Sequence, residues 1–206
     1  MSDTLTAAQR QRFPTLAHYL SVLPQGLDSY PQYVAKASLL RSILDDHPLA
    51  QFASELPRAL VDLAVRPPPL SAWVSEVHFH SITRVAYDLH FRERSQFVAW
   101  SYEAQKKLLS GPLYSLLFAV ISPERGLMLA HSRWETFHRG ITLRVERMPG
   151  QSRVIYGYPP YLIDDFDLGP TLEGLRAAFE LMGAKSVQIF DQQVTPTSAR
   201  ATFSWR

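Results

Sequence analysis

The chain has 206 residues, of which 46% are hydrophobic and 19% are charged, and its formal net charge is +2. This length and composition predict one well-buried globular domain and exclude a disordered chain. The balanced charge argues against nucleic acid as a partner, since nucleic-acid binding needs basic residues gathered on one face. The chain contains no cysteine, which excludes disulfides, thiolate catalysis and cysteine-based metal sites.

The sequence shows no signal for a membrane. The first residues, MSDTLTAAQRQRF, lack the apolar core of a signal peptide. No run approaches the roughly 20 apolar residues that a membrane-spanning helix needs. We therefore expect a soluble, cytoplasmic protein.

The N-terminal two thirds of the chain predict short helices. Apolar residues recur at helical spacing, and repeated prolines interrupt them. The expected helices cover residues 14–24, 33–48, 72–91, 96–109 and 112–121. If the chain has an internal boundary between two parts, we expect it at residues 66–70, which contain the triple proline.

A further helix is predicted from Ser122 to Gly140. Ser122 is a candidate N-cap, Pro123 suits the first helical position, and Gly140 suits a left-handed C-terminal stop. His131, Trp134 and His138 would share one side of this helix.

After Gly140 the hydrophobic period changes from helical to alternating. Strands are predicted at 141–147, 153–158, 186–194 and 199–206, with a helix from 169 to 183. The predicted class is therefore α+β: N-terminal helices packed with a C-terminal ββαββ unit that forms a four-stranded antiparallel sheet. We expect a single domain over 1–206, mainly helical in 1–139 and sheet-forming in 140–206.

The histidines are candidate ligands for a metal or a heme. His131 and His138 are seven residues apart, too far along a helix to chelate one ion. His78 and His80 point in different directions on a helix, whereas Glu76 and His80, four residues apart, form a simple pair. Whether His78, His80 or His138 binds a metal or a heme stays open, and we assign no metal site.

Two charged stretches have ordinary structural explanations and one functional alternative. The acidic run DDFD, residues 164–167, precedes a helix and suits capping. The arginines between 133 and 153 are expected on an exposed sheet face. As an alternative, they form a basic strip for a phosphate, an anionic headgroup or an acidic partner. The usual nucleophile and nucleotide-binding motifs are absent.

The order of segments resembles known families. The phrases WVSEVHFH, GPLYSLLF, SPERGLMLAHSRWETFHRGITLRVE, LRAAFELMGAKSVQI and ATFSWR resemble a myxobacterial paralogous family of unknown function. More distantly, the layout is similar to the heme–nitric-oxide-binding, vinyl-reductase-type and TRAPP-subunit ligand domains. That resemblance implies a small molecule or an acyl chain held between helices and sheet.

In the heme–nitric-oxide group a histidine ligates iron and a Tyr-x-Ser-x-Arg motif holds the propionates. This sequence has histidines but no such motif, so we leave the cofactor unknown.

The favoured hypothesis is a non-catalytic module, sensory or regulatory, that binds a small apolar ligand or lipid in a pocket between helices and sheet. The predicted ligand-binding residues are aromatic or imidazole side chains: Trp134, Phe137, His138, His131, Tyr114, Trp100 and Trp205. The alternative is a protein-interaction module, either a homodimer or a regulatory adaptor, that uses an exposed sheet edge or the proline-rich surface. An enzyme of unrecognised class is third, and no catalytic residue is assigned.

Overall fold

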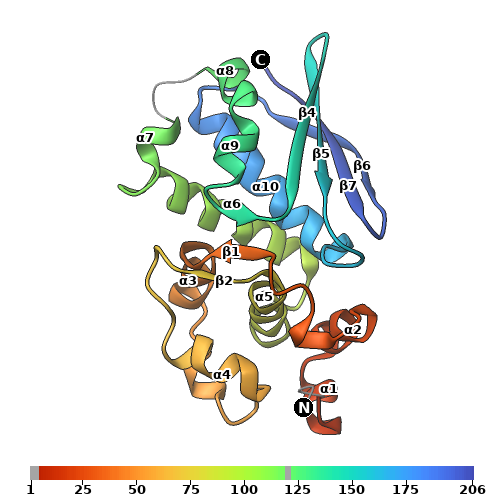
Figure 1. The fold of residues 1–206 in the computed structure, drawn as a ribbon. Helices are drawn as coiled ribbons and strands as arrows, with labels where there is room; N and C mark the ends of the chain where they lie inside the picture. Colours follow the sequence, from red (N-terminus) through yellow and green to blue (C-terminus); the bar gives the residue numbers. More distant parts are fainter. Residues whose placement is uncertain (1–4, 119–121) are drawn as a thin grey trace. The chain divides into compact units, whose positions relative to one another are not determined.

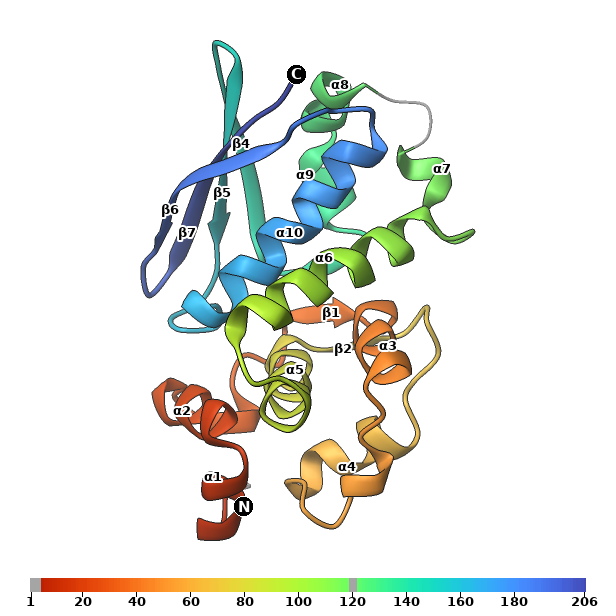
Figure 2. The same cartoon turned by 180° about the vertical axis from the view of Figure 1, so that it is seen from behind.

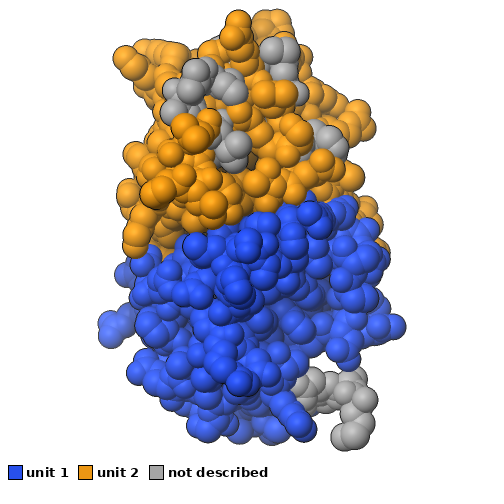
Figure 3. Space-filling model, turned by 60° about the vertical axis from the view of Figure 1, so that its left-hand side comes forward, with its two compact units in different colours: residues 1–96, 138–140 blue, residues 97–137, 141–206 orange. Residues whose placement is uncertain are grey.

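The computed structural model describes residues 5–118 and 122–206, and the side chains of a few residues between 117 and 131 are not described. Figure 1 shows the fold. The chain divides into two compact units, coloured separately in Figure 3. Unit 1 comprises residues 1–96 and 138–140, and unit 2 comprises residues 97–137 and 141–206. Each unit is described by itself.

Unit 1 is mainly helical. In chain order its elements are α1 (Ala7–Arg12), α2 (Pro14–Val22), η1 (Gly26–Asp28), β1 (Val34–Lys36), α3 (Ala37–Asp46), η2 (Ala50–Phe52), α4 (Arg58–Val65), β2 (Trp73–Ser75), α5 (Glu76–His90) and β3 (His138–Arg139). Helix α5 contacts α2, α3 and α4, which lie around it in Figure 1. Its buried residues occupy every side of the helix, as expected for a central helix.

Unit 2 combines helices with one sheet. Its elements are α6 (Arg94–Ser110, whose first residues lie in unit 1), α7 (Ser115–Phe118), α8 (Pro123–Met128), α9 (Ala130–Trp134), β4 (Thr142–Met148), β5 (Gln151–Gly157), α10 (Asp165–Leu181), β6 (Gln188–Val194) and β7 (Ser198–Ser204). The four strands are antiparallel in the order β4-β5-β7-β6. The predicted class and the ββαββ order are confirmed.

One face of the four-stranded sheet forms the core of unit 2. Helix α10 runs along this face (Figure 2), and Phe179 of α10 contacts Phe203 of β7 with ring centroids 5.3 Å apart. Val154, Tyr156 and Ala201 are buried on the same face. These apolar side chains share one face because apolar and polar residues alternate along the strands, and successive side chains of a strand point to opposite faces.

A three-stranded sheet in unit 1 was not predicted. Its order is β2-β1-β3, and both pairings are antiparallel. The sequence pattern assigned residues 34–36 and 73–75 to helices that begin only at Ala37 and Glu76. Those two helix predictions were wrong at their N-terminal ends, because three-residue strands are too short for a period to distinguish them from helix.

The predicted helix from Ser122 to Gly140 was also wrong in part. It begins at Pro123 as expected, but the chain leaves helical geometry after Trp134, and His138 pairs with Ala35 as part of β3. Gly140 does adopt a positive φ of 93°, at the end of a strand and not of a helix. Backbone pairing with β1 therefore replaces the last predicted helical turns.

Helix α10 begins earlier than predicted, and the acidic run explains why. The Asp164 carboxylate accepts hydrogen bonds from the backbone N–H groups of Phe166 and Asp167, and the Asp167 carboxylate accepts one from the Asp164 N–H. This capping box, expected from the acidic run, starts the helix at Asp165. Pro170 consequently lies inside the helix, where it removes one backbone hydrogen bond.

Among the described residues, the helices are all too short or too polar to cross a membrane.

A substitution at Gly140 tests whether the close approach of this residue to Tyr33 contributes to stability. A Cβ added there would lie 2.7 Å from Tyr33 Cδ1, whereas a Cβ at Gly150 (φ 69°) would meet nothing within 4 Å. We expect Gly140→Ala to lower the free energy of unfolding by about 2–4 kcal/mol, combining backbone strain with overpacking. The matched control Gly150→Ala should cost about 1–2 kcal/mol from strain alone. Equal losses in urea titrations would show that the Tyr33 contact does not matter.

Candidate functional site

A cluster of titratable side chains lies in unit 1 around Glu76. The Glu76 side chain has 0% exposure, and its Oε1 lies 2.7 Å from His138 Nδ1. Its Oε2 lies 3.5 Å from His80 Nε2, whose side chain is 6% exposed. A carboxylate is thus held between two imidazoles, away from water.

Local structure explains how these three groups meet. Glu76 is the first residue of α5, where the helix dipole favours a negative charge. His80 follows one turn later, so the predicted Glu76–His80 pair is confirmed. His138 arrives from a distant part of the sequence because β3 pairs with β1, with Ala35 opposite His138.

The cluster continues along α5 through a buried cation. The Arg84 side chain is fully buried, and its Nη1 donates a hydrogen bond to the His80 carbonyl at 3.2 Å. Its guanidinium carbon lies 3.8 Å from the centroid of the Tyr19 ring. Asp88 accepts hydrogen bonds from the Thr15 and Leu16 N–H groups, and burial raises the pKa of this carboxyl above its usual value. Asp88 therefore caps α2 from a neighbouring helix.

This cluster is an ionic network. Its donor atoms do not converge on one point, and within residues 5–118 and 122–206 no group of three or more His, Asp or Glu side chains is placed to hold a metal ion. The sequence identified the Glu76–His80 pair but missed Arg84 and the contact with His138. Only the four-residue spacing was visible in the sequence.

The aromatic residues predicted to line a pocket are packed in separate pairs in unit 2. Trp134 Nε1 donates a hydrogen bond to the Ile141 carbonyl at 3.0 Å, and the Trp134 ring lies 5.1 Å from that of Tyr156. Tyr114 and Phe137 are in contact, with ring centroids 4.7 Å apart. These are contacts of core side chains.

The remaining predicted site residues lie elsewhere. Trp100 stacks on Phe97, and Trp205 stacks on Phe179. His138 belongs to unit 1, as described above. His131 lies in α9, and its side chain falls outside the described part of the chain. Within unit 2, the contacts of the described site residues form separate aromatic pairs. Whether any of the seven residues contacts a ligand stays a prediction.

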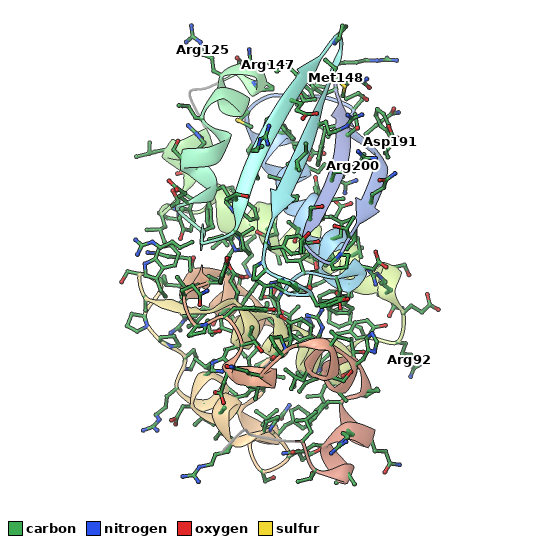
Figure 4. All side chains as sticks on the ribbon, turned by 45° about the vertical axis from the view of Figure 1, so that its right-hand side comes forward. Arg92, Arg125, Arg147, Met148, Asp191 and Arg200 are labelled. Atoms are coloured by element: carbon green, nitrogen blue, oxygen red, sulfur yellow. The ribbon has the colours of Figure 1, made fainter. Side chains whose placement is uncertain are left out.

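A cavity of about 490 Å³ lies in unit 2. It is lined by residues from the start of α8, the β4–β5 hairpin, the loop after α10 and the C-terminal end of the chain: Pro123, Arg147, Met148, Gly150, Gln151, Ser152, Gly183, Ala184, Trp205 and Arg206. Of the predicted site residues it includes Trp205. Figure 4 shows Arg147 and Met148 at the hairpin end of the sheet. No pattern in the sequence marks this set, since its members come from segments that are distant in the sequence.

Comparison with known proteins identifies the fold. No protein-family sequence profile matches the chain, and no curated protein matches it. Solved H-NOX domains do match in structure. An oxygen-binding H-NOX domain related to soluble guanylate cyclases, in its oxygen complex, has a TM-score of 0.53 and 9% identity, covering 82% of this chain and 92% of its own.

Two further H-NOX structures match to a similar degree. One, from work on heme distortion, has a TM-score of 0.57 and 9% identity, covering 82% of this chain and 92% of its own. Another, from work on the mechanism of H-NOX activation, has a TM-score of 0.55 and 8% identity, covering 82% and 94%. At such low identity these matches show that the chain has the H-NOX fold, as the distant resemblance implied. The resemblance to a myxobacterial paralogous family stays a prediction.

One H-NOX neighbour comes from work on heme distortion, and the described lining of the cavity in unit 2 does not fit a heme. The described lining of the cavity in unit 2 contains no histidine, tyrosine or cysteine. The His138 and His80 imidazoles face the Glu76 carboxylate. The Tyr-x-Ser-x-Arg motif is absent from the sequence.

The Glu76–His138 contact predicts coupled mutational effects. We expect His138→Ala to destabilise the protein by about 2–4 kcal/mol, because it leaves a buried carboxylate with a weaker partner. Glu76→Gln should cost less, about 1–2 kcal/mol, since it removes the buried charge and keeps an amide for hydrogen bonding. The double variant should cost less than the sum of the two.

Urea unfolding measures all three, with exposed His18→Ala as a control expected within about 0.5 kcal/mol of wild type. Strictly additive losses would refute an energetic link between Glu76 and His138.

The stacked pair His47 and His90 predicts a pH dependence of stability. Their ring centroids are 5.0 Å apart, and burial lowers the pKa of both imidazoles, with His90 lowering that of His47 further. The unfolded chain then binds more protons than the folded protein, so stability should fall as pH drops below about 6.5. His47→Gln with His90→Gln should flatten this slope in unfolding measured between pH 7 and 5.

Some slope should remain in that double variant, because burial also lowers the pKa of His78. A slope identical to wild type would exclude the stacked pair as its source.

Proposed function

We propose that this protein is a non-catalytic, sensory module that binds a small ligand in the cavity of unit 2. The observation that carries the proposal is the lining of that cavity. It contains the apolar side chains of Trp205 and Met148 together with the guanidinium groups of two arginines. Pockets of a few hundred Å³ with an apolar wall and a few polar groups are the usual sites for small ligands. The H-NOX fold supports the proposal, because an H-NOX relative is described as binding oxygen.

The lining also defines the ligand class. Trp205 is held by its stack on Phe179, so its ring offers a fixed apolar surface beside Met148. Arg147 and Arg206 add positive charge, and guanidinium groups bind carboxylate and phosphate in a bidentate geometry. The expected ligand is therefore an apolar or aromatic molecule, lipids included, that carries one anionic group.

The chemistry of the lining supports a non-catalytic role. Within the described lining there is no histidine and no acidic side chain to act as a general acid or base. Binding would bury the apolar part of the ligand, and the arginines would orient its anionic end.

The buried aromatic pairs are assigned a supporting role in this proposal. Trp134 with Tyr156, and Tyr114 with Phe137, pack beneath the surface of unit 2 and stabilise its core. A ligand contact by Trp134, Phe137, Tyr114 or Trp100 stays a prediction from the sequence, as does one by His131 or His138.

The cavity can be tested with two fluorescent probes that share their rings and differ in charge. We expect the anionic probe 1-anilinonaphthalene-8-sulfonate to bind more tightly than neutral N-phenyl-1-naphthylamine. Arg147→Ala should weaken binding of the anionic probe about tenfold and leave the neutral probe unchanged. Trp205→Ala should weaken both, because it removes the apolar wall.

Arg92→Ala, which alters an exposed arginine of unit 1, is the control and should change neither affinity. Circular dichroism confirms that each variant is folded. Native mass spectrometry and an absorbance spectrum of the purified full chain complete the test. A co-purifying anionic lipid supports the proposal, whereas a heme absorbance band, or probe binding insensitive to both substitutions, would overturn it.

A further inference from the structure

The exposed face of the four-stranded sheet in unit 2 carries arginines in register, and this observation is independent of the proposed ligand site. Arg144 of β4 lies opposite Ile155 of β5, and Ile155 lies opposite Arg200 of β7. Directly opposed residues project from the same face of a sheet. One row across three strands therefore reads Arg144, Ile155, Arg200; we call it the arginine row.

A second row on the same face lies beside the first. Glu146 is opposite Arg153, Arg153 is opposite Thr202, which is buried, and Thr202 is opposite Phe190 of the edge strand β6. Arg153 Nη1 is 3.7 Å from Glu146 Oε2, so this arginine already has an acidic neighbour. The second row therefore contributes little net charge.

The arginine row differs because its cations have no ion-pair partner in the described part of the chain. Arg144 and Arg200 are exposed, and neither forms an ion pair with any carboxylate of the described residues. Asp191, in the irregular stretch of β6 shown with Arg200 in Figure 4, forms no ion pair with it. Ile155 is partly exposed between these two longer side chains. The row offers two open guanidinium groups on either side of an apolar contact.

We propose that the arginine row docks an acidic amphipathic helix of a partner protein. Arg144 and Arg200 lie on the two strands that flank β5, so their backbones are about 10 Å apart. Residues seven apart on one face of a helix are separated by about 10.5 Å, and the residue four after the first lies between them. Carboxylates at the two outer positions would meet the two guanidinium groups, and an apolar residue between them would cover Ile155.

Other occupants fit this face less well. A second copy stacked on it by two-fold symmetry would bring arginine rows together and so would be repelled. Membrane-binding surfaces usually gather about 4–8 basic residues, whereas the arginine row has two. Nucleic-acid binders make about 6–10 phosphate contacts, more than this face can supply.

The test uses a fluorescein-labelled alanine-based helical peptide with two glutamates seven residues apart and a leucine four residues after the first. We expect it to bind the full chain at low salt, with affinity that falls as salt rises. Exchange of both glutamates for glutamine should weaken binding about tenfold, and so should Arg144→Glu with Arg200→Glu.

A matched control keeps the change in total charge the same. Arg58→Glu with Arg92→Glu alters two exposed arginines of unit 1 and should leave peptide binding within about twofold of wild type. Thermal melting confirms that both double variants fold, and Arg144→Lys with Arg200→Lys should retain part of the affinity.

Three results would overturn the proposal. They are no peptide binding by the wild-type chain at low salt, equal weakening in the two charge-reversal variants, and stronger binding to vesicles of phosphatidylcholine with phosphatidylglycerol or to a single-stranded oligonucleotide. Probe binding at the cavity is measured separately, so loss of one site is distinguishable from loss of the other.

Discussion

A buried carboxyl group in contact with two imidazoles links distant segments of unit 1. Removing a carboxylate from water costs several kcal/mol unless close partners compensate for it. Glu76 has two such partners, His80 from its own helix and His138 from β3. The second partner comes from a segment whose neighbours on both sides along the chain belong to unit 2. The contact between Glu76 and His138 thus helps to hold residues 138–140 in unit 1.

Other contacts also hold β3 in unit 1. The Arg139 guanidinium lies 4.0 Å from the centroid of the Trp73 ring, which Lys36 also approaches at 4.3 Å. A Cβ at Gly140 would lie 2.7 Å from Tyr33 Cδ1, so a side chain there would force the Tyr33 ring to move. A strand of two residues has too few backbone hydrogen bonds to persist alone, so side-chain contacts must hold it in register.

In unit 2 one sheet supports two surfaces of different chemistry. The face against α10 is mostly apolar and buried, and the hairpin end of the sheet forms part of a cavity lined by Trp205 and two arginines. The opposite face presents the arginine row. Both surfaces follow from the same antiparallel register, because a shift of one residue would exchange buried and exposed side chains along each strand. A module that binds a ligand and a partner would use both.

Local sequence signals were sufficient to predict the alternating strands after Gly140, the capping role of the acidic run that includes Asp164, and the Glu76–His80 pair on one helix. These features depend on residues within a few positions of one another, so residue type and period suffice. Long-range packing was needed for the short strands β1, β2 and β3, the contact of His138 with Glu76, the burial of Arg84, and the choice of arginines that stand side by side. Each of these depends on contacts between distant segments, whose burial and charge compensation outweigh the local preference for helix.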